Sequence, residues 1–515
     1  MPNIKTALLS VYDKTGIVEF ARSLVGLNID LISTGGTSEL LRKNGIEHRQ
    51  VEDLTKFPER LDGRVKTLHP HIFMGILARR EVSEHLRQLA ESDLTGIDMV
   101  VVNLYPFEQT IKEKHITVEK ALEHIDIGGV SLLRAAAKNF NDVVAVTSPD
   151  RYDETIELLK THSNTIPQEL SGNNAAGVFA LTAHYDSCIG TYLSQAADGR
   201  ELPGNVVISM DKVQSLRYGE NPHQRASLYC AAGEQLPYEQ LHGKELSYNN
   251  IVDIDSALSL AFSYDRPTTA IIKHTNPCGL GSDDTISEAY DKAFSTDPDS
   301  AFGGIIACNR AIDEKTAEKI SKIFVEVVAA PDFEDNAFET LSRKKNIRII
   351  KVAPLFDPER VYREIKRIHG GYLLQERDTL TIDPSNLNVV TKRAPTEQEM
   401  ESLLFGWKMI RYVKSNAIVY CTRDRTLGIG TGQMSRVDAS EIAVMKAKKQ
   451  GLDLKGSCVI SDAFFPFRDG VDAAAAAGAT AVIQPGGSVR DEEVITACNE
   501  QNLAMVFTGI RHFKH

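Results

Sequence analysis

The sequence has 515 residues, of which 42% are hydrophobic and 25% charged, and its formal net charge at pH 7 is -12. This composition is typical of a folded protein with several hydrophobic cores, and it gives no indication of disorder. The acidic balance argues against nucleic acid or an anionic membrane as a partner, because such partners require an extended basic face. A small anionic substrate is still compatible with it, if a few lysines and arginines gather locally.

The cysteines indicate the compartment. Seven of them are scattered along the chain without any C-x-x-C pair, which predicts a reducing, cytoplasmic location and neither a disulfide framework nor a thiolate zinc site. Residues 1–14 carry charge too early for a signal peptide, and no apolar run approaches the roughly 20 residues of a membrane span. We therefore expect a protein that is neither exported nor inserted in a membrane, and that holds no metal.

Repeated strand, loop and helix units are predicted at the start of the chain. A strand over residues 6–12 leads to a helix with one apolar face, and a short strand over 30–33 leads through the glycine loop 34–37 to a helix over 38–44. The apolar face of the first helix consists of Ile17, Phe20, Ala21 and Leu24. Glycines at a helix start expose backbone N–H groups that can bind phosphate, although the loop by itself favours an ordinary tight turn.

Further polar groups follow the next predicted strands. Arg64, Lys66 and Thr67 form a candidate anion clamp, with a solvated charged face as the alternative. A buried strand over 99–102 ends at Asn103, and the loop 125–129 leads into a helix over 131–138. Glycines, an acid and a lysine are thus expected to converge at strand ends.

The stretch 268–281 carries the strongest chemical signal. Residues 268–272 predict a buried strand, and Pro277, Gly279 and Gly281 predict a loop after it. Lys273 and His274 would then lie at the carboxyl end of a strand, where open α/β sheets bind ligands. A lysine that keeps the neighbouring imidazole neutral gives a general base with an electrostatic partner; a surface lysine and a structural histidine are the alternative.

The remaining organisation is less distinct. Residues 196–205 have linker composition, which places a domain boundary near 200. The last third repeats features of the middle third weakly, which predicts two related α/β halves. Residues 428–432 carry three glycines but lack the third glycine of a dinucleotide fingerprint, so we interpret them as a close backbone approach or a bulge.

Several long motifs, in order along the whole chain, together closely resemble one family, the bifunctional AICAR transformylase/IMP cyclohydrolases of purine biosynthesis. The motifs are residues 10–16, 64–70, 125–129 with 134–139, 217–224, 273–277, 461–469 and 511–515. The resemblance implies an α/β protein with a methylglyoxal-synthase-like cyclohydrolase domain at 1–199. It also implies a transformylase region at 200–515, made of two cytidine-deaminase-like halves at roughly 200–375 and 376–515.

The resemblance also implies the chemistry. The transformylase moves a formyl group from 10-formyltetrahydrofolate, its cosubstrate, to the amine of AICAR, and the cyclohydrolase closes the product FAICAR to IMP with loss of water. His274 would remove the proton of the amine, Lys273 and Asn416 would stabilise the formyl oxygen, and Lys138, with Asp126, would serve cyclisation. The family also suggests a homodimer, with small molecules as its other partners.

The binding residues implied by the resemblance fall into three groups. In the cyclohydrolase site they are Lys14, Ser33, Thr34, Gly35, Gly36, Thr37, Arg64, Val65, Lys66, Thr67, Asn103, Leu104 and Ile127. Those for AICAR are Arg217, Tyr218, Asn250, Gly303, Glu326, Phe464 and Arg511. Those for folate are Arg436, Val437, Asp469, Ser488 and Val489. Tyr12 stands where other members carry serine, and Glu326 where some carry aspartate.

Two other functions are compatible with parts of the sequence. Residues 1–200 could form a nucleotide-sensing regulatory domain, since a fold does not fix a function; Lys138 beside the Asp126 loop favours chemistry instead. Pro277-Cys278 superficially resembles part of the zinc-deaminase signature, but Gly281 occupies the place of its second cysteine and the chain has no H-x-E sequence.

Overall fold

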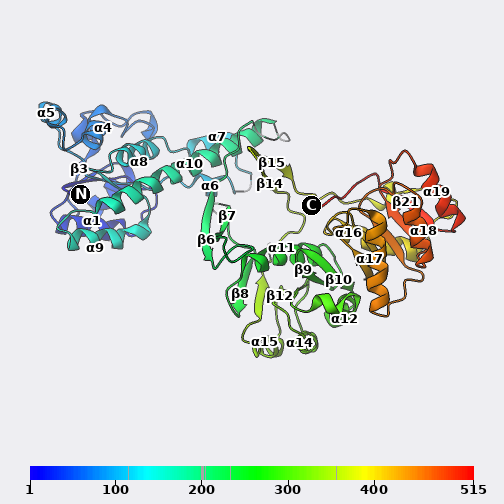
Figure 1. The fold of residues 1–515 in the computed structure, drawn as a ribbon. Coiled ribbons are helices and arrows are strands. Elements are labelled where there is room, and N and C mark those ends of the chain that lie inside the picture. The colour runs from blue at the N-terminus through cyan, green and yellow to red at the C-terminus, as the bar shows by residue number, and fades with distance from the viewer. Residues whose placement is uncertain (114, 199–201, 203, 232–233, 355) are drawn as a thin grey trace. The chain divides into compact units, whose positions relative to one another are not determined.

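The computed structural model describes residues 1–113, 115–198, 202, 204–231, 234–354 and 356–515. The chain divides into two compact units, which are residues 1–211 with 231–234 and residues 212–230 with 235–515. The domain boundary predicted at 199–200 falls on residues outside those that the structure describes. The predicted α/β class is confirmed in both units, because each consists of a sheet covered by helices on both faces (Figure 1).

The first unit contains a five-stranded parallel sheet in the order β3-β2-β1-β4-β5. Its strands are β1 (Thr6–Leu9), β2 (Asp30–Ser33), β3 (Arg49–Gln50), β4 (Met99–Val101) and β5 (Val144–Val146). Its helices are α1 (Ile17–Gly26), α2 (Gly35–Lys43), α3 (Val51–Thr55), α4 (Pro70–Leu77), α5 (Ser83–Glu91), α6 (Phe107–Thr110), α7 (Val118–Glu123), α8 (Gly128–Lys138), α9 (Tyr152–Thr161) and α10 (Gln168–Asp198), with 3₁₀ turns at Leu61–Gly63 and Pro149–Arg151. The predicted apolar face of α1 is buried.

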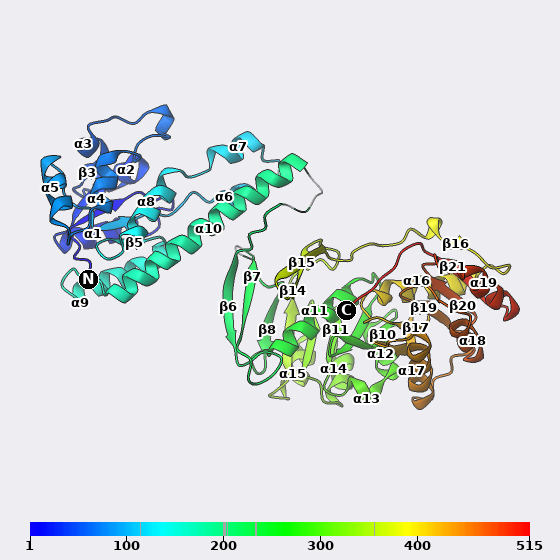
Figure 2. The ribbon, with the colours of Figure 1, turned by 45° about the horizontal axis from the view of Figure 1, so that its top comes forward.

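Two hydrophobic clusters hold this sheet. Helices α1, α2 and α9 pack on one face, and α3, α4, α8 and α10 pack on the other. Helix α10 is a single long helix that starts near α9 and reaches α6 and α7 (Figure 2). Both α2 and α8 begin three residues before their predicted starts, at glycines, so the first turn of each helix lies at the edge of the sheet where the parallel strands end.

The second unit contains a twelve-stranded sheet in the order β16-β21-β20-β19-β17-β18-β10-β9-β11-β12-β13-β8. Its first half is built from β8 (Tyr238–His242), α11 (Tyr248–Phe262), β9 (Thr268–Lys273), β10 (Asn276–Ser282), α12 (Ile286–Thr296), α13 (Pro298–Ala301), β11 (Ile305–Cys308), α14 (Glu314–Ser321), β12 (Val327–Ala330), α15 (Asp335–Ser342) and β13 (Arg348–Val352). Its second half is built from β16 (Asn388–Val389), α16 (Glu397–Ile410), β17 (Ile418–Thr422), β18 (Arg425–Gly430), α17 (Arg436–Lys449), β19 (Cys458–Ser461), α18 (Asp469–Ala476), β20 (Ala481–Gln484), α19 (Asp491–Glu500) and β21 (Ala504–Phe507). Outside this sheet, β6 (Met210–Leu216) pairs with β7 (Ala226–Ala231), β14 (Arg363–Ile368) pairs with β15 (Gly371–Glu376), and a 3₁₀ turn spans Pro384–Asn386.

The predicted duplication is visible in the strand order. The run β10-β9-β11-β12-β13 in the first half matches β18-β17-β19-β20-β21 in the second. Helices α11 and α16 cover one face of the joint sheet, and α12, α14, α15, α17, α18 and α19 cover the other. The halves meet where β10 pairs with β18 in antiparallel fashion, at Gly281 and Arg425.

The prediction that Pro277, Gly279 and Gly281 form a loop after β9 is wrong, because these residues lie in strand β10. The glycines serve close helix packing: a Cβ atom on Gly279 would lie 1.9 Å from the carbonyl oxygen of Ala293 in α12. The second half repeats the device, since a Cβ on Gly430 would lie 1.7 Å from the carbonyl oxygen of Ala439 in α17. The close-approach interpretation of residues 428–432 therefore agrees with the structure, whereas the same feature in 279–281 looks like a strand terminator in the sequence.

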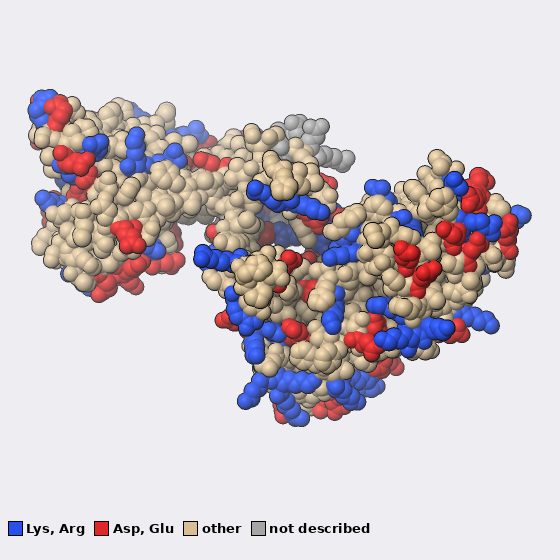
Figure 3. Space-filling model, viewed as in Figure 1, with Lys and Arg blue, Asp and Glu red and all other residues tan. Residues whose placement is uncertain are grey.

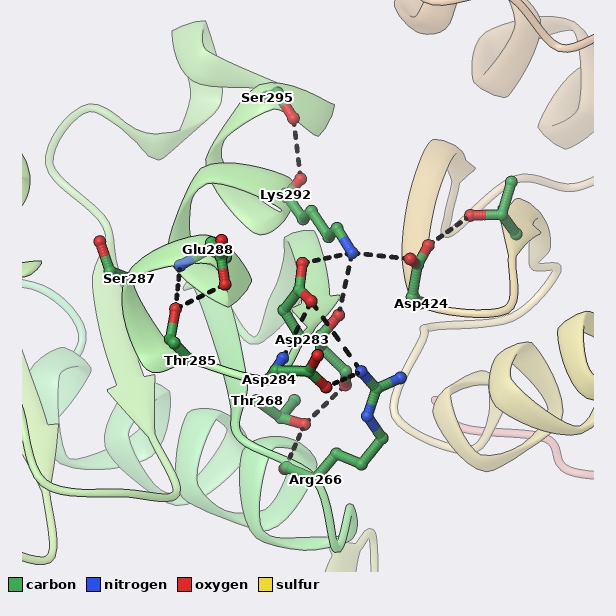
Figure 4. Close-up of polar contacts among 12 residues, drawn as sticks. Arg266, Thr268, Asp283, Asp284, Thr285, Ser287, Glu288, Lys292, Ser295 and Asp424 are labelled. Atoms are coloured by element: carbon green, nitrogen blue, oxygen red, sulfur yellow. Dashed lines mark hydrogen bonds and ion pairs between the residues drawn. The ribbon is translucent and has the colours of Figure 1, made fainter.

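An ion-pair cluster lies at the junction of the halves (Figure 4). The Lys292 ammonium of α12 contacts the carboxylate of Asp283 at 2.5 Å and that of Asp424 at 2.6 Å. Asp424 belongs to the turn between β17 and β18, so this lysine joins the first half to the second. Each of the three side chains is only about a quarter exposed or less, so solvent screens the contacts weakly.

Candidate active sites

The first unit gathers most of its predicted nucleotide-binding residues where the parallel strands end. Lys14, after β1, donates through Nζ to the Thr37 hydroxyl at 3.1 Å and also to the Val11 carbonyl. The Lys66 ammonium lies 3.2 Å from the position of a Cβ on Gly35, which has φ +54°. Two ammonium groups therefore flank the start of α2, and burial together with the Lys66 charge lowers the pKa of Lys14. A helix start beside two lysines is suited to an anion.

An acidic group lies at the start of α8. The Asp126 carboxylate accepts a hydrogen bond from the Gly129 backbone N–H at 2.6 Å, and the Asp126 backbone N–H donates to the Tyr185 hydroxyl at 2.8 Å. Burial raises the pKa of Asp126, against the opposing effects of the Gly129 N–H and the Lys66 charge. Burial and the Asp126 charge also raise the pKa of Tyr105, a residue absent from the predicted site.

The other residues predicted for this site differ in burial and in the hydrogen bonds that they form. Asn103 accepts from the backbone N–H groups of Tyr12 and Asp13, at 2.6 and 2.8 Å, so its amide holds the loop after β1. Ser33 is fully buried and donates to the Leu9 carbonyl, so its hydroxyl is already used inside the sheet. Thr34 precedes α2, and Gly36 lies in the first turn of that helix. Val65 forms a β-bridge with Arg60, and Thr67 is buried near Gly128. Leu104 is half-buried, whereas Ile127 is 58% exposed.

Two predicted residues depart from the expected arrangement. Lys138 is the last residue of α8, whereas Asp126 precedes the first turn of that helix. At about 1.5 Å per residue the helix separates its two ends by roughly 15 Å, so the expectation that Lys138 lies beside the Asp126 loop is wrong for a single chain. Arg64 is largely exposed and forms an ion pair with Glu123, so Lys66, and not Arg64, is the cation directed at the glycine turn.

The second unit has a cavity of about 660 Å³ at the edge of the first half. Seven predicted residues line it: Arg217, Tyr218, Asn250, Lys273, His274, Gly303 and Glu326. Ten further lining residues were not predicted: Lys244, Glu245, Leu246, Ser247, Asn249, Asp253, Ile305, Phe324, Asn346 and Arg348. The cavity lies at the carboxyl end of β9 but at the amino ends of β11, β12 and β13, so the rule of carboxyl strand ends holds only for β9.

The hairpin turn between β9 and β10 presents the two predicted catalytic groups. His274 and Thr275 both have positive φ, at 54° and 63°, although neither is glycine and threonine is β-branched. Such a conformation costs about 1–2 kcal/mol per residue. The Asp253 carboxylate of α11 holds the turn, because it accepts the backbone N–H of His274 at 3.1 Å and of Thr275 at 2.6 Å. Lys273 donates to the Phe302 carbonyl at 2.7 Å.

The opposite wall of the cavity is a polar network. The Glu326 carboxylate accepts from the Asn250 amide at 2.9 Å and from the Arg348 guanidinium at 3.1 Å. Asn250 is itself fixed by a capping box with Ser247 at the start of α11. The Arg217 guanidinium lies over the Tyr218 ring at 4.8 Å. Donors and acceptors are thus available for a polar, nucleotide-sized ligand.

The residues predicted from the second half lie outside the lining of this cavity. Asp462 is fully buried and accepts from Arg436 at 3.0 Å and from Ser415 at 2.5 Å, next to Asn416. The Arg511 guanidinium lies over the Phe513 ring at 4.4 Å, and Arg436 contacts the same ring at 5.7 Å. Val437 and Asp469 lie in the first turns of α17 and α18, Phe464 is 37% exposed, and Ser488 and Val489 precede α19, with Val489 fully exposed.

The side-chain amide of Asn276 connects the His274 turn to the loop that follows β18. The Asn276 carbonyl oxygen accepts from the Thr431 hydroxyl at 2.6 Å, and its NH₂ donates to the His274 carbonyl at 3.1 Å. Gln433, two residues after Thr431, accepts the backbone N–H of Asn416 through its carbonyl at 3.0 Å. Asn416 therefore lies at the same edge of the sheet as His274, reached through Asn276.

The cysteine of the zinc-deaminase alternative has the wrong chemistry for a metal ligand. Cys278 is buried in β10, and burial raises the pKa of its thiol to about 12. A thiol must lose its proton to bind zinc. Around Cys278 the described residues contain no group of three potential metal-binding side chains.

Lysine and arginine side chains are interspersed with acidic ones over the face of the molecule drawn in Figure 3. Among the helices that the structure describes, none combines the length and the apolar character needed to cross a membrane.

Two separate α/β units, one with a lysine–aspartate site at helix starts and one with a Lys273–His274 cavity, define an enzyme with two sites.

The comparisons with known proteins specify that class. Residues 136–446 match the model of the AICARFT/IMPCHase bienzyme, and residues 16–131 match the MGS-like domain. A solved structure entitled "Crystal structure of ForH" is 35% identical over 37% of this chain and 99% of its own, with a TM-score of 0.34. The chain belongs to the AICARFT/IMPCHase bienzyme family. It is a bifunctional enzyme of purine biosynthesis, a folate-dependent formyltransferase and an IMP cyclohydrolase that act on small molecules.

Proposed function

We propose that the cavity of the second unit binds AICAR while its amine takes the formyl group of 10-formyltetrahydrofolate. The observation that supports this most is the strained turn that places Lys273 and His274 together at the cavity wall. The amine of AICAR is conjugated with its imidazole ring and is a poor nucleophile, so a base must remove its proton during the attack. His274 takes that proton, and Lys273 stabilises the charge that develops on the formyl oxygen. The bond between the formyl carbon and N10 then breaks, and N10 of the departing tetrahydrofolate takes up a proton.

For the other predicted residues we propose the roles that the resemblance implies. Arg217, Tyr218, Asn250, Gly303 and Glu326 hold the nucleotide, and Asn416 assists Lys273 at the formyl oxygen. Arg436, Val437, Asp469, Ser488 and Val489 lie toward the folate. Phe464 and Arg511 lie outside the cavity lining of their own unit, which supports a homodimer in which a second chain completes the AICAR site. The division of the chain into two compact units supports two domains, for which we propose the limits 1–199 and 200–515. The scattered cysteines support a cytoplasmic location.

In the first unit we propose that the start of α2, with Lys14, Lys66 and Thr37, holds the phosphate of FAICAR and IMP. The start of α8, with Asp126, faces the base, together with Asn103, Leu104 and Ile127. Cyclisation requires the carboxamide nitrogen of FAICAR to lose a proton as it attacks the formyl carbon, and the elevated pKa of Asp126 suits a proton acceptor. Lys138, the proton-transfer group that the resemblance implies, lies at the opposite end of α8, so we assign it no step at this site within one chain.

The overall proposal is tested by adding AICAR and 10-formyltetrahydrofolate to the purified chain and following IMP by ultraviolet absorbance. We expect IMP to form without any other enzyme. Formation of FAICAR alone would retain the transformylase assignment and contradict that of the first unit. Absence of any formylated product would contradict the assignment of the cavity.

The role of Asp126 gives a pH prediction. Because the pKa of Asp126 is raised, its carboxylate forms only above the usual aspartate range, so the acidic limb of the cyclisation rate should lie above that range. Asp126→Asn should lower the cyclisation rate by about 10²–10⁴-fold and leave formyl transfer unchanged. Asp142→Asn, at the other end of α8, is the matched control. A wild-type acidic limb in the Asp126 variant would show that another group titrates.

A further inference from the structure

The proposed base and the proposed partner of Lys273 at the formyl oxygen lie in different halves of the large sheet. His274 belongs to the turn between β9 and β10, whereas Asn416 precedes β17. Strands β10 and β18 are antiparallel where the halves join, so the first residue of β10 meets the residues that follow β18. That first residue is Asn276, which has no role in the reaction proposed above.

The hydrogen bonds of Asn276 fix the orientation of its half-buried side-chain amide. The amide oxygen accepts from the Thr431 hydroxyl at 2.6 Å and from the Lys414 backbone N–H at 3.4 Å. The NH₂ group donates to the His274 carbonyl at 3.1 Å. Because an amide oxygen cannot donate, the hydroxyl proton of Thr431 must point at Asn276. The amide therefore joins the turn that carries the base to two segments of the second half.

These two segments continue the pairing of β17 with β18. The Gly432 backbone N–H donates to the Lys414 carbonyl at 2.8 Å. The backbones of Asn416 and Gln433 form two hydrogen bonds with each other, at 3.0 and 3.4 Å. Gln433 also donates through its side chain to the Thr431 carbonyl at 2.9 Å. A shift of Thr431 is therefore passed to Asn416 through direct hydrogen bonds.

A carboxylate holds each end of this connection within its own half. Asp253 holds the first-half turn through two backbone N–H groups. In the second half the fully buried Asp462 accepts from the Ser415 hydroxyl at 2.5 Å and from the Ala417 backbone N–H at 3.1 Å. These two residues flank Asn416. Because each end is fixed in its own half, the bonds of the Asn276 amide fix the two ends relative to each other.

We propose that Asn276 is a positioning residue for formyl transfer, which sets His274 of the first half against Asn416 of the second through its hydrogen bond to Thr431. This inference rests on the roles proposed above for His274 and Asn416. The described residues that line the cavity do not include Asn276, so it acts through its neighbours and not on the substrate. Misplacing a reacting group by about 1 Å can lower a rate by about 100-fold, so the loss of one bond among several should lower it by about tenfold.

The first test removes the hydroxyl of Thr431 and keeps the shape of the side chain. Thr431→Val should lower the kcat of formyl transfer by about tenfold and change the KM for AICAR by less than about twofold, because the cavity is intact. Thr431→Ser restores the donor and should recover the wild-type kcat. The matched control is Thr422→Val, at the other end of the β17–β18 hairpin, where a half-buried hydroxyl donates to Asp424 at 2.9 Å. This control should keep the wild-type kcat.

The second test asks whether Asn276 and Thr431 act through one hydrogen bond. Asn276→Ala should lower kcat by at least as much as Thr431→Val, because it also breaks the bond to His274. The double variant should lose no more than Asn276→Ala by itself, whereas independent effects multiply.

Three results would overturn the inference: wild-type kcat in Thr431→Val, an equal loss in Thr431→Ser, or multiplied losses in the double variant. The proposed function would still stand in each case if His274→Ala and Asn416→Ala are impaired in formyl transfer. Full formyl transfer in those two variants would contradict the proposed function and this inference together.

Discussion

The two hairpins that start the matching halves of the large sheet differ in strain. Between β9 and β10 the turn residues His274 and Thr275 have positive φ, whereas Arg423 and Asp424, between β17 and β18, are absent from the positive-φ residues of the described chain. The first turn is held by the Asp253 carboxylate and lines the cavity; the second is held by the Lys292 ion pair (Figure 4). The comparison teaches that the duplicated fold keeps the turn, and that the positive-φ residues occur in the turn that carries the proposed base, His274.

The largest difference should come from removing a turn side chain in each half. His274→Ala should lower formyl transfer by about 10²–10⁴-fold, because the proposed base is lost. Arg423→Ala, the equivalent change, should leave the rate unchanged, since Arg423 is exposed and its contact with Glu401 is a surface ion pair at 3.8 Å. Steady-state kinetics of both activities measure this, with cyclisation as the internal control. Equal losses in the two variants would contradict the assignment of the base to the first turn.

The carboxylate that holds the strained turn should have the next largest effect. In Asp253→Asn one oxygen becomes an NH₂ group that faces a backbone N–H, so one of the two hydrogen bonds is lost. Hydrogen bonds to charged groups are worth about 1.5–3 kcal/mol, so formyl transfer should fall by roughly 10- to 100-fold. The loss should appear in kcat more than in the KM for AICAR, because Asp253 positions His274.

The matched control is Asp424→Asn, the same chemical change in the relaxed turn. It should alter stability but not kcat. If Asp253→Asn changed stability alone, the strain of the first turn would be unrelated to catalysis.

A glycine substitution in the His274 turn and one in the Asp424 turn should change the unfolding free energy in opposite directions. Thr275→Gly relieves a left-handed conformation that costs about 1–2 kcal/mol, and the added freedom of the unfolded chain offsets roughly half of that gain. We expect the unfolding free energy to rise by up to about 1 kcal/mol. Asp424→Gly should lower it by about 1–3 kcal/mol, because Lys292 loses a partner. Thermal unfolding of the full chain measures both; destabilisation by Thr275→Gly would show that the turn is not strained.

The smallest expected effect is on how the unfolding free energy depends on pH. Burial acts to raise the pKa of Asp283, but the hydrogen bond and charge of Lys292 outweigh it, and the pKa is lowered from 3.8. A carboxyl group with a depressed folded-state pKa contributes stability above its unfolded pKa, and this contribution is lost as the pH falls through the folded value. Lys292→Met should therefore destabilise by about 1 kcal/mol at pH 7 and by less near pH 3. A constant difference between these pH values would mean that Lys292 acts by packing alone.

Much of the fold could be predicted from local patterns. The buried strand β9 could be predicted from its β-branched residues, and the apolar face of α1 from helical periodicity. Gly279 and Gly281 were misleading, because the sequence does not show which helix will approach a glycine. Their role depends on the carbonyl oxygens of α12, so only the packed structure distinguishes a strand glycine from a loop glycine.

The candidate sites were predictable to a different degree. Lys273 and His274 could be found because they follow a predicted strand, and Lys66 because it lies in a short segment with Arg64 and Thr67. Asp253 and Arg348 could not, since each meets its partner from a distant part of the sequence.

The sequence by itself determined the α/β class and much of the order of the elements, and it nominated the candidate site residues, because helix and strand periodicity and motif chemistry are local properties. The tertiary structure decided the rest. It brought Asp253 under the turn of His274, moved Lys138 to the far end of α8 from Asp126, and joined the two halves through β10 and β18. These arrangements depend on which surfaces bury each other, and burial is a property of the whole packed unit rather than of any segment.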